Sequence, residues 1–161
     1  MAFRTAVRPA DAAAVHKLVA ATGFFSADEL DVAVELVDEC LAKGKASGYE
    51  FVFLDDPEAR GELLGYTCYG PIPATQSSYD LYWIAVAPEQ QRSGLGHKLI
   101  VESERQAQLL GATRMYVDTS GREQYKPTRR FYEQNGYTVA ARLEDFYAPG
   151  DAKVIYSKAL V

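Results

Sequence analysis

The sequence predicts one α/β domain built on a mixed sheet of about six to seven strands with flanking helices. Asp80–Val86 is a strand-like run, Gly94–Leu110 has helical spacing of apolar residues, and Arg114–Thr119 is again strand-like. Two strands joined through a helix form a parallel pair with a right-handed crossover. Other strand-like segments are separated by short turns, as in antiparallel pairs. A length of 161 residues fits a single domain over 1–161.

Before the parallel pair, the sequence predicts a strand, two helices and a hairpin. Phe3–Arg8 is expected to form the first strand, and a helix follows Pro9 and ends at Gly23. Ser26 to Glu29 form a capping box, which begins a second helix that stops at Gly44. Next come two strands that predict an antiparallel hairpin, at Tyr49–Leu54 and Glu62–Tyr69.

After the parallel pair, the sequence predicts a short helix and a final hairpin. The helix starts at Pro127 and ends at Asn135-Gly136. The strands Tyr137–Glu144 and Val154–Leu160 then close the chain, with a turn at Ala148–Asp151.

Composition excludes several classes of protein. A hydrophobic content of 48% is typical of soluble globular proteins. The net charge of −5 argues against nucleic-acid binding, which needs a basic surface. No leader-like segment or membrane-spanning apolar run is present, so a cytoplasmic protein without a membrane partner is expected. The two cysteines and two histidines lack metal-ligand spacing, so no metal site is expected.

The glycines of Gln91-Arg92-Ser93-Gly94-Leu95-Gly96 lie where a strand gives way to a helix. A glycine turn that opens a helix presents unpaired N–H groups at the positive end of the helix dipole, which favours phosphate. A dinucleotide fingerprint fails because Leu99 occupies the third glycine position, and the P-loop spacing is absent.

The remaining pattern, Q/R-x-x-G-x-G/A after a strand and a proline, resembles that of the GNAT superfamily of acyl-coenzyme A dependent N-acetyltransferases. Residues 128–137, Thr-Arg-Arg-Phe-Tyr-Glu-Gln-Asn-Gly-Tyr, are similar to the second signature of that family. The two motifs occur in the family's order and at about its separation. The resemblance covers roughly the C-terminal half of the chain.

The resemblance implies acetyl-coenzyme A as co-substrate and no metal. It places the pantetheine against the main chain of Ile84, Ala85 and Val86, like an added strand. It places the pyrophosphate in the glycine turn, with charge added by Arg92 and Lys98. The expected coenzyme-binding residues are Ile84, Ala85, Val86, Gln91, Arg92, Ser93, Gly94, Leu95, Gly96, His97 and Lys98.

The resemblance also implies catalytic roles. Tyr132 matches the family's general acid, which protonates the departing thiolate. A carboxylate, acting directly or through water, is expected to help deprotonate the amine. Asp80 and Asp118 both qualify, and the sequence leaves the choice open. Strand alternation predicts that Asp80 shares a face with Tyr82, Ile84 and Val86.

The acceptor pocket is expected beside Phe25, Glu29, Tyr82 and Tyr147. The acceptor would be a primary amine of a small molecule or of a peptide or protein. Two other functions remain open: a non-catalytic acyl-coenzyme A sensing or binding module, and a nucleotide-binding domain that uses the same turn. Homodimers are common among similar proteins, although no feature of this sequence establishes one.

Overall fold

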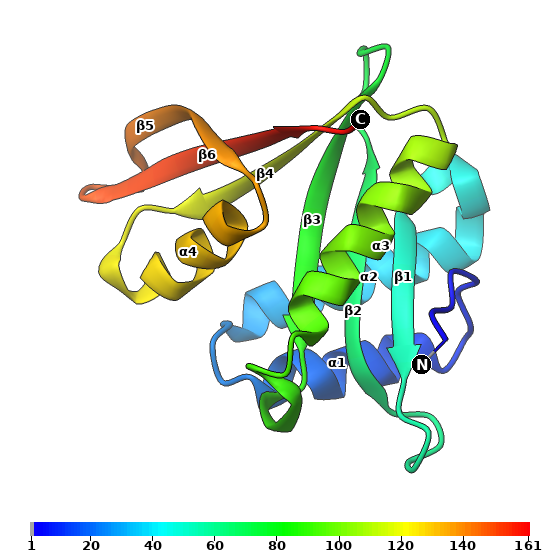
Figure 1. The fold of residues 1–161 in the computed structure, drawn as a ribbon. Helices are drawn as coiled ribbons and strands as arrows, with labels where there is room; N and C mark the ends of the chain where they lie inside the picture. Colours follow the sequence, from blue (N-terminus) through cyan, green and yellow to red (C-terminus); the bar gives the residue numbers. More distant parts are fainter. Residues whose placement is uncertain (1) are drawn as a thin grey trace.

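The computed structural model describes residues 2–161, and it confirms an α/β fold with a mixed central sheet (Figure 1). In this range the sheet has six strands in the order β1-β2-β3-β4-β6-β5, with four α-helices around it. The strands are β1 (Glu50–Asp55), β2 (Leu63–Pro71), β3 (Ser78–Val86), β4 (Arg114–Ser120), β5 (Thr138–Ala148) and β6 (Asp151–Ala159). The helices are α1 (Asp11–Ala21), α2 (Ala27–Lys43), α3 (Leu95–Leu109) and α4 (Lys126–Gln134).

The sheet consists of two halves that meet at its centre. Strands β1, β2 and β3 pair antiparallel, and so do β4, β6 and β5. The halves are joined by the predicted parallel pair, β3 with β4, which extends only over Ser78–Asp80 and Arg114–Tyr116. Beyond Asp80 the two strands diverge, as Figure 1 shows, so the sheet opens between its halves.

Helices cover both faces of the first half. Side chains of α1 and α2 pack on one face, around Phe51, Phe53 and Tyr66, while α3 packs on the other, around Val52 and Leu81. Helix α4 belongs to the second half and joins the α3 core through Tyr132. In residues 2–161 no helix is long and apolar enough to cross a membrane.

The predicted helix ends are confirmed. Ser26 Oγ accepts a hydrogen bond from the Glu29 N–H at 3.2 Å, and Glu29 Oε1 accepts one from the Ser26 N–H at 3.1 Å. This reciprocal capping box begins α2. Gly44, with a φ of 58°, follows the last residue of that helix. The C-terminal hairpin is longer than predicted, because β5 continues to Ala148 and β6 begins at Asp151.

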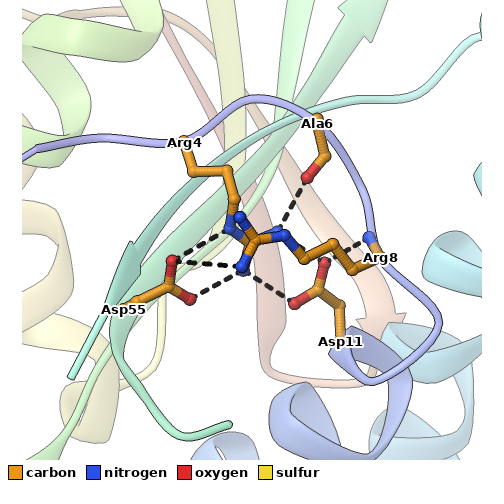
Figure 2. Close-up of polar contacts among 5 residues, drawn as sticks. All are labelled: Arg4, Ala6, Arg8, Asp11 and Asp55. Carbon is orange, nitrogen blue, oxygen red and sulfur yellow. Dashed lines mark hydrogen bonds and ion pairs between the residues drawn. The ribbon is translucent and has the colours of Figure 1, made fainter. Parts of the chain in front are cut away.

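The predicted first strand, Phe3–Arg8, is wrong. Only Arg4 forms a bridge, in which its N–H donates to the Phe53 carbonyl at 2.9 Å and its carbonyl accepts from the Phe53 N–H at 2.7 Å. The Arg4 guanidinium then holds Asp55, Asp11 and the Ala6 carbonyl together, as Figure 2 shows. Because these contacts fold the segment back toward α1, it cannot continue along β1.

Candidate active site

A cavity of about 1000 Å³ occupies the opening between β3 and β4. Residues 82–86 of β3 line one side, and Asp118, Thr119 and Ser120 of β4 line the other. Because β3 has no strand partner on this side beyond Asp80, its edge can hydrogen-bond an extended ligand. The remaining lining residues are Thr22, Phe24, Phe25, Glu29, Val32, Gln91, Gln124, Tyr125, Pro127, Thr128, Tyr132, Tyr147 and Asp151.

A β-bulge on β3 changes which side chains face this cavity. Cys68 of β2 opposes Trp83 and Tyr69 opposes Leu81, so Tyr82 has no partner across the pair. One extra residue reverses the alternation that follows it. Ile84 and Val86 consequently pack on the α3 side with Leu81, whereas Asp80 points to the opposite face. The prediction that Asp80 shares a face with Ile84 and Val86 is therefore wrong.

A second cavity, of about 720 Å³, lies at the start of α3. Gly94 adopts a φ of 83° and gives the turn its shape. Within residues 2–161, no backbone carbonyl accepts a hydrogen bond from the N–H groups of Gly94, Leu95, Gly96 or His97. These four donors and the positive end of the helix dipole are suited to bind phosphate.

Most of the expected coenzyme-binding residues lie around the two cavities. Ile84, Val86 and Gln91 line both, Ala85 lines the first, and the second is also lined by Arg92, Gly94, Gly96 and His97. Three residues line neither. Ser93 donates to the Gln90 carbonyl, Lys98 is exposed, and the Leu95 side chain is buried in the core below α3.

The second cavity has a basic border that includes side chains from α4. Arg92, Lys126 and Arg130 line an adjoining hollow of about 670 Å³, together with one carboxylate, Glu123, which lies 3.8 Å from Lys126 Nζ. His97 Nδ1 lies 2.6 Å from Asn135 Oδ1, which connects α3 to the end of α4. A polyanionic ligand at the start of α3 would therefore meet positive charge from the turn before that helix and from α4.

Tyr132 lines both cavities and lies where they meet. Its side chain is 5% exposed, and within residues 2–161 its hydroxyl takes part in no hydrogen bond. Burial raises the pKa of Tyr132 well above its usual value, so the hydroxyl keeps its proton at neutral pH. The rings of Tyr137 and Tyr156, each 6.0 Å away between centroids, hold the ring in place.

The two candidate bases differ in their surroundings. Asp118 lines the first cavity, and its Oδ2 lies 3.3 Å from Lys153 Nζ. Asp80 is half-buried and is not a lining residue. Burial first and Asp118 second raise the pKa of Asp80 to about 6, while Lys153 acts in the opposite direction. The two carboxylates are thus electrostatically coupled.

All four residues expected at the acceptor pocket, Phe25, Glu29, Tyr82 and Tyr147, line the first cavity. They come from the loop before α2, from the first turn of α2, from β3 and from β5. Asp151 joins them; its Oδ1 accepts a hydrogen bond from Ser120, and its Oδ2 lies 3.2 Å from Arg122 Nε. This side of the first cavity is therefore acidic and aromatic, in contrast to the basic border of the second cavity.

Sequence reasoning missed part of the aromatic lining. Trp83 and Tyr125 line the first cavity, and the ring of Phe24 touches Tyr125 at 4.9 Å between centroids. No motif marks Trp83 or Tyr125, and the contact of Tyr125 with Phe24 joins segments that are far apart in the sequence. Within residues 2–161, no group of three or more His, Cys, Asp or Glu side chains is arranged to hold a metal ion.

Comparisons with known proteins agree with this architecture. Residues 20–137 match the model of the acetyltransferase (GNAT) family. A Desulfovibrio desulfuricans protein assigned to the GNAT family superimposes with a TM-score of 0.94 and 50% sequence identity, over 99% of each chain. No curated protein gives a significant match to the sequence.

Two more distant structures share the fold. An aminoglycoside 6'-N-acetyltransferase complexed with coenzyme A has a TM-score of 0.77 and 16% identity, over 100% of this chain and 98% of its own. The Escherichia coli ribosomal-protein-S18-alanine N-acetyltransferase has a TM-score of 0.74 and 16% identity, over 99% and 93%. Together with the family match, the fold and the paired cavities, these findings show that the chain belongs to the GNAT family of acetyltransferases.

Proposed function

We propose that residues 1–161 form one catalytic domain that transfers an acetyl group from acetyl-coenzyme A to a primary amine. The observation that carries this proposal is the position of Tyr132, where an acidic, aromatic cavity meets a cavity at the start of α3. A cationic amine favours the first cavity and a phosphorylated coenzyme favours the second. The reacting groups would then meet beside the Tyr132 hydroxyl.

In this proposal, the free donors from Gly94 to His97 bind the pyrophosphate, and Arg92 adds positive charge. The edge of β3 from Ile84 to Val86 holds the pantetheine as an added strand would be held. Gln91 Nε2 donates to the Val86 carbonyl at 3.2 Å, so the residues before the turn are tied to the end of that edge. The acetyl group then lies between β3 and β4.

The carboxylates prepare the amine for attack. An alkylammonium with a pKa near 10.4 loses its proton at pH 7 at a cost of roughly 4 to 5 kcal/mol. Asp118 faces the cavity and accepts this proton directly or through water, and Asp80 shares the charge because the pair is coupled. The amine nitrogen then bonds to the acetyl carbon, the carbon–sulfur bond breaks, and Tyr132 gives its proton to the sulfur. The new amide nitrogen loses its extra proton through water, and this proton restores the Tyr132 hydroxyl.

Two distant relatives support an amine acceptor, since their names specify an aminoglycoside and the alanine of a ribosomal protein. The test is thiol release from acetyl-coenzyme A with a panel of small amines and peptides, beside thermal unfolding with acetyl-coenzyme A. We expect amine-dependent release, and stabilisation by about 2.7 kcal/mol at 100 times the dissociation constant. Stabilisation without release for any amine would favour a binding module instead.

A further inference from the structure

The three carboxylates that line the acceptor cavity differ in how their charge is compensated. Asp118 pairs with Lys153 at 3.3 Å, and Asp151 pairs with Arg122 at 3.2 Å. Glu29 also lines the cavity, but within residues 2–161 no Lys, Arg or His side chain forms an ion pair with it. Glu29 therefore contributes a negative charge that no cationic side chain of residues 2–161 pairs with.

The capping box fixes the position of this charge. Glu29 Oε1 accepts the Ser26 N–H at 3.1 Å, while Ser26 Oγ accepts the Glu29 N–H at 3.2 Å. One carboxylate oxygen is thereby held at the start of α2. Within residues 2–161, no hydrogen bond reaches the other oxygen, Oε2, which leaves it free to bind a ligand.

An aromatic wall lies beside Glu29 and spans the opening of the sheet. We use this name for Trp83, Phe25, Phe24 and Tyr125, whose consecutive ring centroids are 4.7, 5.3 and 4.9 Å apart. The wall extends from β3, through the loop between α1 and α2, to the short helix Glu123–Tyr125 before α4. The Arg122 guanidinium already lies over the Tyr125 ring, 5.5 Å from its centroid, whereas no cation of residues 2–161 lies over Trp83, Phe25 or Phe24. Ring faces attract organic cations and pack against their hydrocarbon chains.

The phenols of the cavity are consistent with a negative potential there. Burial and then Asp80 raise the pKa of Tyr82 to about 12. Burial, followed by Asp118 and Asp151, raises the pKa of Tyr147. Both hydroxyls remain neutral at pH 7, so they can accept hydrogen bonds from an ammonium group without adding charge.

We propose that the acceptor is a small diamine-like cation, whose reacting amine lies near Asp118 and Tyr132 and whose second ammonium group binds Glu29 along the aromatic wall. This inference rests on the proposed function and names its substrate class. An extended peptide is held mainly by main-chain hydrogen bonds along a strand edge. The wall offers ring faces instead, and the β3 edge is assigned to the coenzyme, so the site selects a small molecule.

The conservative variant Glu29→Gln isolates the charge. Glutamine also completes a capping box, so this variant keeps the start of α2 intact while it removes the negative charge. A matched control is Glu35→Gln, on the same helix, because Glu35 is exposed and does not line the cavity. Acetylation of 1,4-diaminobutane, 1-aminobutane and 4-amino-1-butanol would be compared in all three proteins, with a short peptide as a further acceptor.

We expect wild-type kcat/KM for the diamine to exceed that for either monoamine by about tenfold, which corresponds to one ion pair. Glu29→Gln should abolish most of this preference, and Glu35→Gln should keep it. An unchanged preference in Glu29→Gln, or a peptide as the best acceptor, would overturn the inference.

A binding measurement tests the role of Glu29 separately from the proposed acetyltransferase activity. Thermal stabilisation of the coenzyme A complex by 1,4-diaminobutane needs no turnover, and it should be clear in wild type and lost in Glu29→Gln. Diamine binding without thiol release would contradict the proposed function alone. Thiol release with equal use of diamines and monoamines would contradict only the inference about Glu29.

Discussion

Asp80 is a carboxylate whose environment disfavours its charge. It is half-buried, lies near Asp118, and within residues 2–161 no hydrogen bond compensates it. Its pKa of about 6 exceeds the ordinary 3.8, so the folded protein binds a proton more tightly than the unfolded chain. Protonated Asp80 therefore stabilises the fold at low pH, and this stability is lost as pH rises through about 6.

Because the pKa of Asp80 is raised in the folded protein, we predict that Asp80→Asn raises the melting temperature at pH 7 by removing an unfavourable negative charge. The gain should shrink toward pH 4, where Asp80 is already protonated in the folded protein. Thermal unfolding of both proteins from pH 4 to 8 measures the effect. A variant that is less stable than wild type at pH 7 would contradict the assigned cause.

The same coupling predicts the pH dependence of activity. Asp118 is the proposed base, and if Asp80 serves instead, wild-type kcat/KM should fall as pH drops below about 6, because a general base must be deprotonated. Asp118 raises the pKa of Asp80. If Asp80 is the base, Asp118→Asn should therefore move the acidic limb of the pH–rate profile to lower pH. Loss of the limb in Asp118→Asn alone would assign the base to Asp118.

Single residues show where sequence reasoning reached its limit. Motifs and strand patterns in the sequence indicate Tyr132, the glycine turn and both aspartates, and the structure places Tyr132 and Asp118 at the same cavity. The face occupied by Asp80 was mispredicted, because nothing in the sequence marks the bulge at Tyr82. A bulge depends on pairing with β2, which local alternation does not reveal.

At the scale of elements, the two glycines of the turn serve different purposes. Gly94 has a φ of 83°, and a Cβ there would meet no atom within 4 Å. A Cβ on Gly96 would lie 3.0 Å from Phe131 Cε1 and 3.3 Å from its Cζ. Gly94 thus sets the backbone conformation, whereas Gly96 allows α3 and α4 to approach closely.

We predict that Gly96→Val weakens acetyl-coenzyme A binding by at least about tenfold, because the side chain forces Phe131 away and distorts the second cavity. Gly94→Ala should instead cost about 1 kcal/mol of stability through backbone strain. Calorimetric titration with acetyl-coenzyme A and thermal unfolding distinguish the two effects. Normal coenzyme affinity in a folded Gly96→Val protein would refute the placement of the coenzyme.

Elements whose signals are local were predicted well. The Ser26–Glu29 capping box, the Gly44 stop and the β1–β2 hairpin are present, because caps and turns depend on neighbouring residues. The strand predicted at Phe3–Arg8 failed for the opposite reason. The conformation of this segment depends on the ion pairs of Arg4 with Asp11 and Asp55, and Asp55 lies in a distant part of the sequence.

At the scale of the whole molecule, the site exists because the sheet opens. Three residue pairs join β3 to β4, and the space beyond them becomes the first cavity. The Phe24–Tyr125 contact lines this space and joins the α1–α2 loop to the short helix Glu123–Tyr125, and no sequence pattern predicts a contact at that separation. The order of elements in the sequence predicts the parallel pair. How far the two strands stay paired, and therefore how wide the sheet opens, is visible only in the structure.

Positive and negative side chains are separated between the two cavities. The chain carries a net charge of −5, yet Arg92, Lys126 and Arg130 gather beside the start of α3. Glu29, Asp118 and Asp151 line the other cavity. In the proposed function, this arrangement would direct a negatively charged coenzyme and a cationic amine to different sides of Tyr132.

The most direct test of the account is thiol release by Tyr132→Phe with the amine that wild type uses best. The Tyr132 hydroxyl has no hydrogen-bond partner in residues 2–161, so its removal should leave stability and acetyl-coenzyme A affinity close to wild type. Tyr116→Phe, a tyrosine outside both cavities, serves as control. We predict that kcat falls at least about tenfold in Tyr132→Phe alone. Wild-type turnover in that variant would contradict the assignment of Tyr132 as the proton donor.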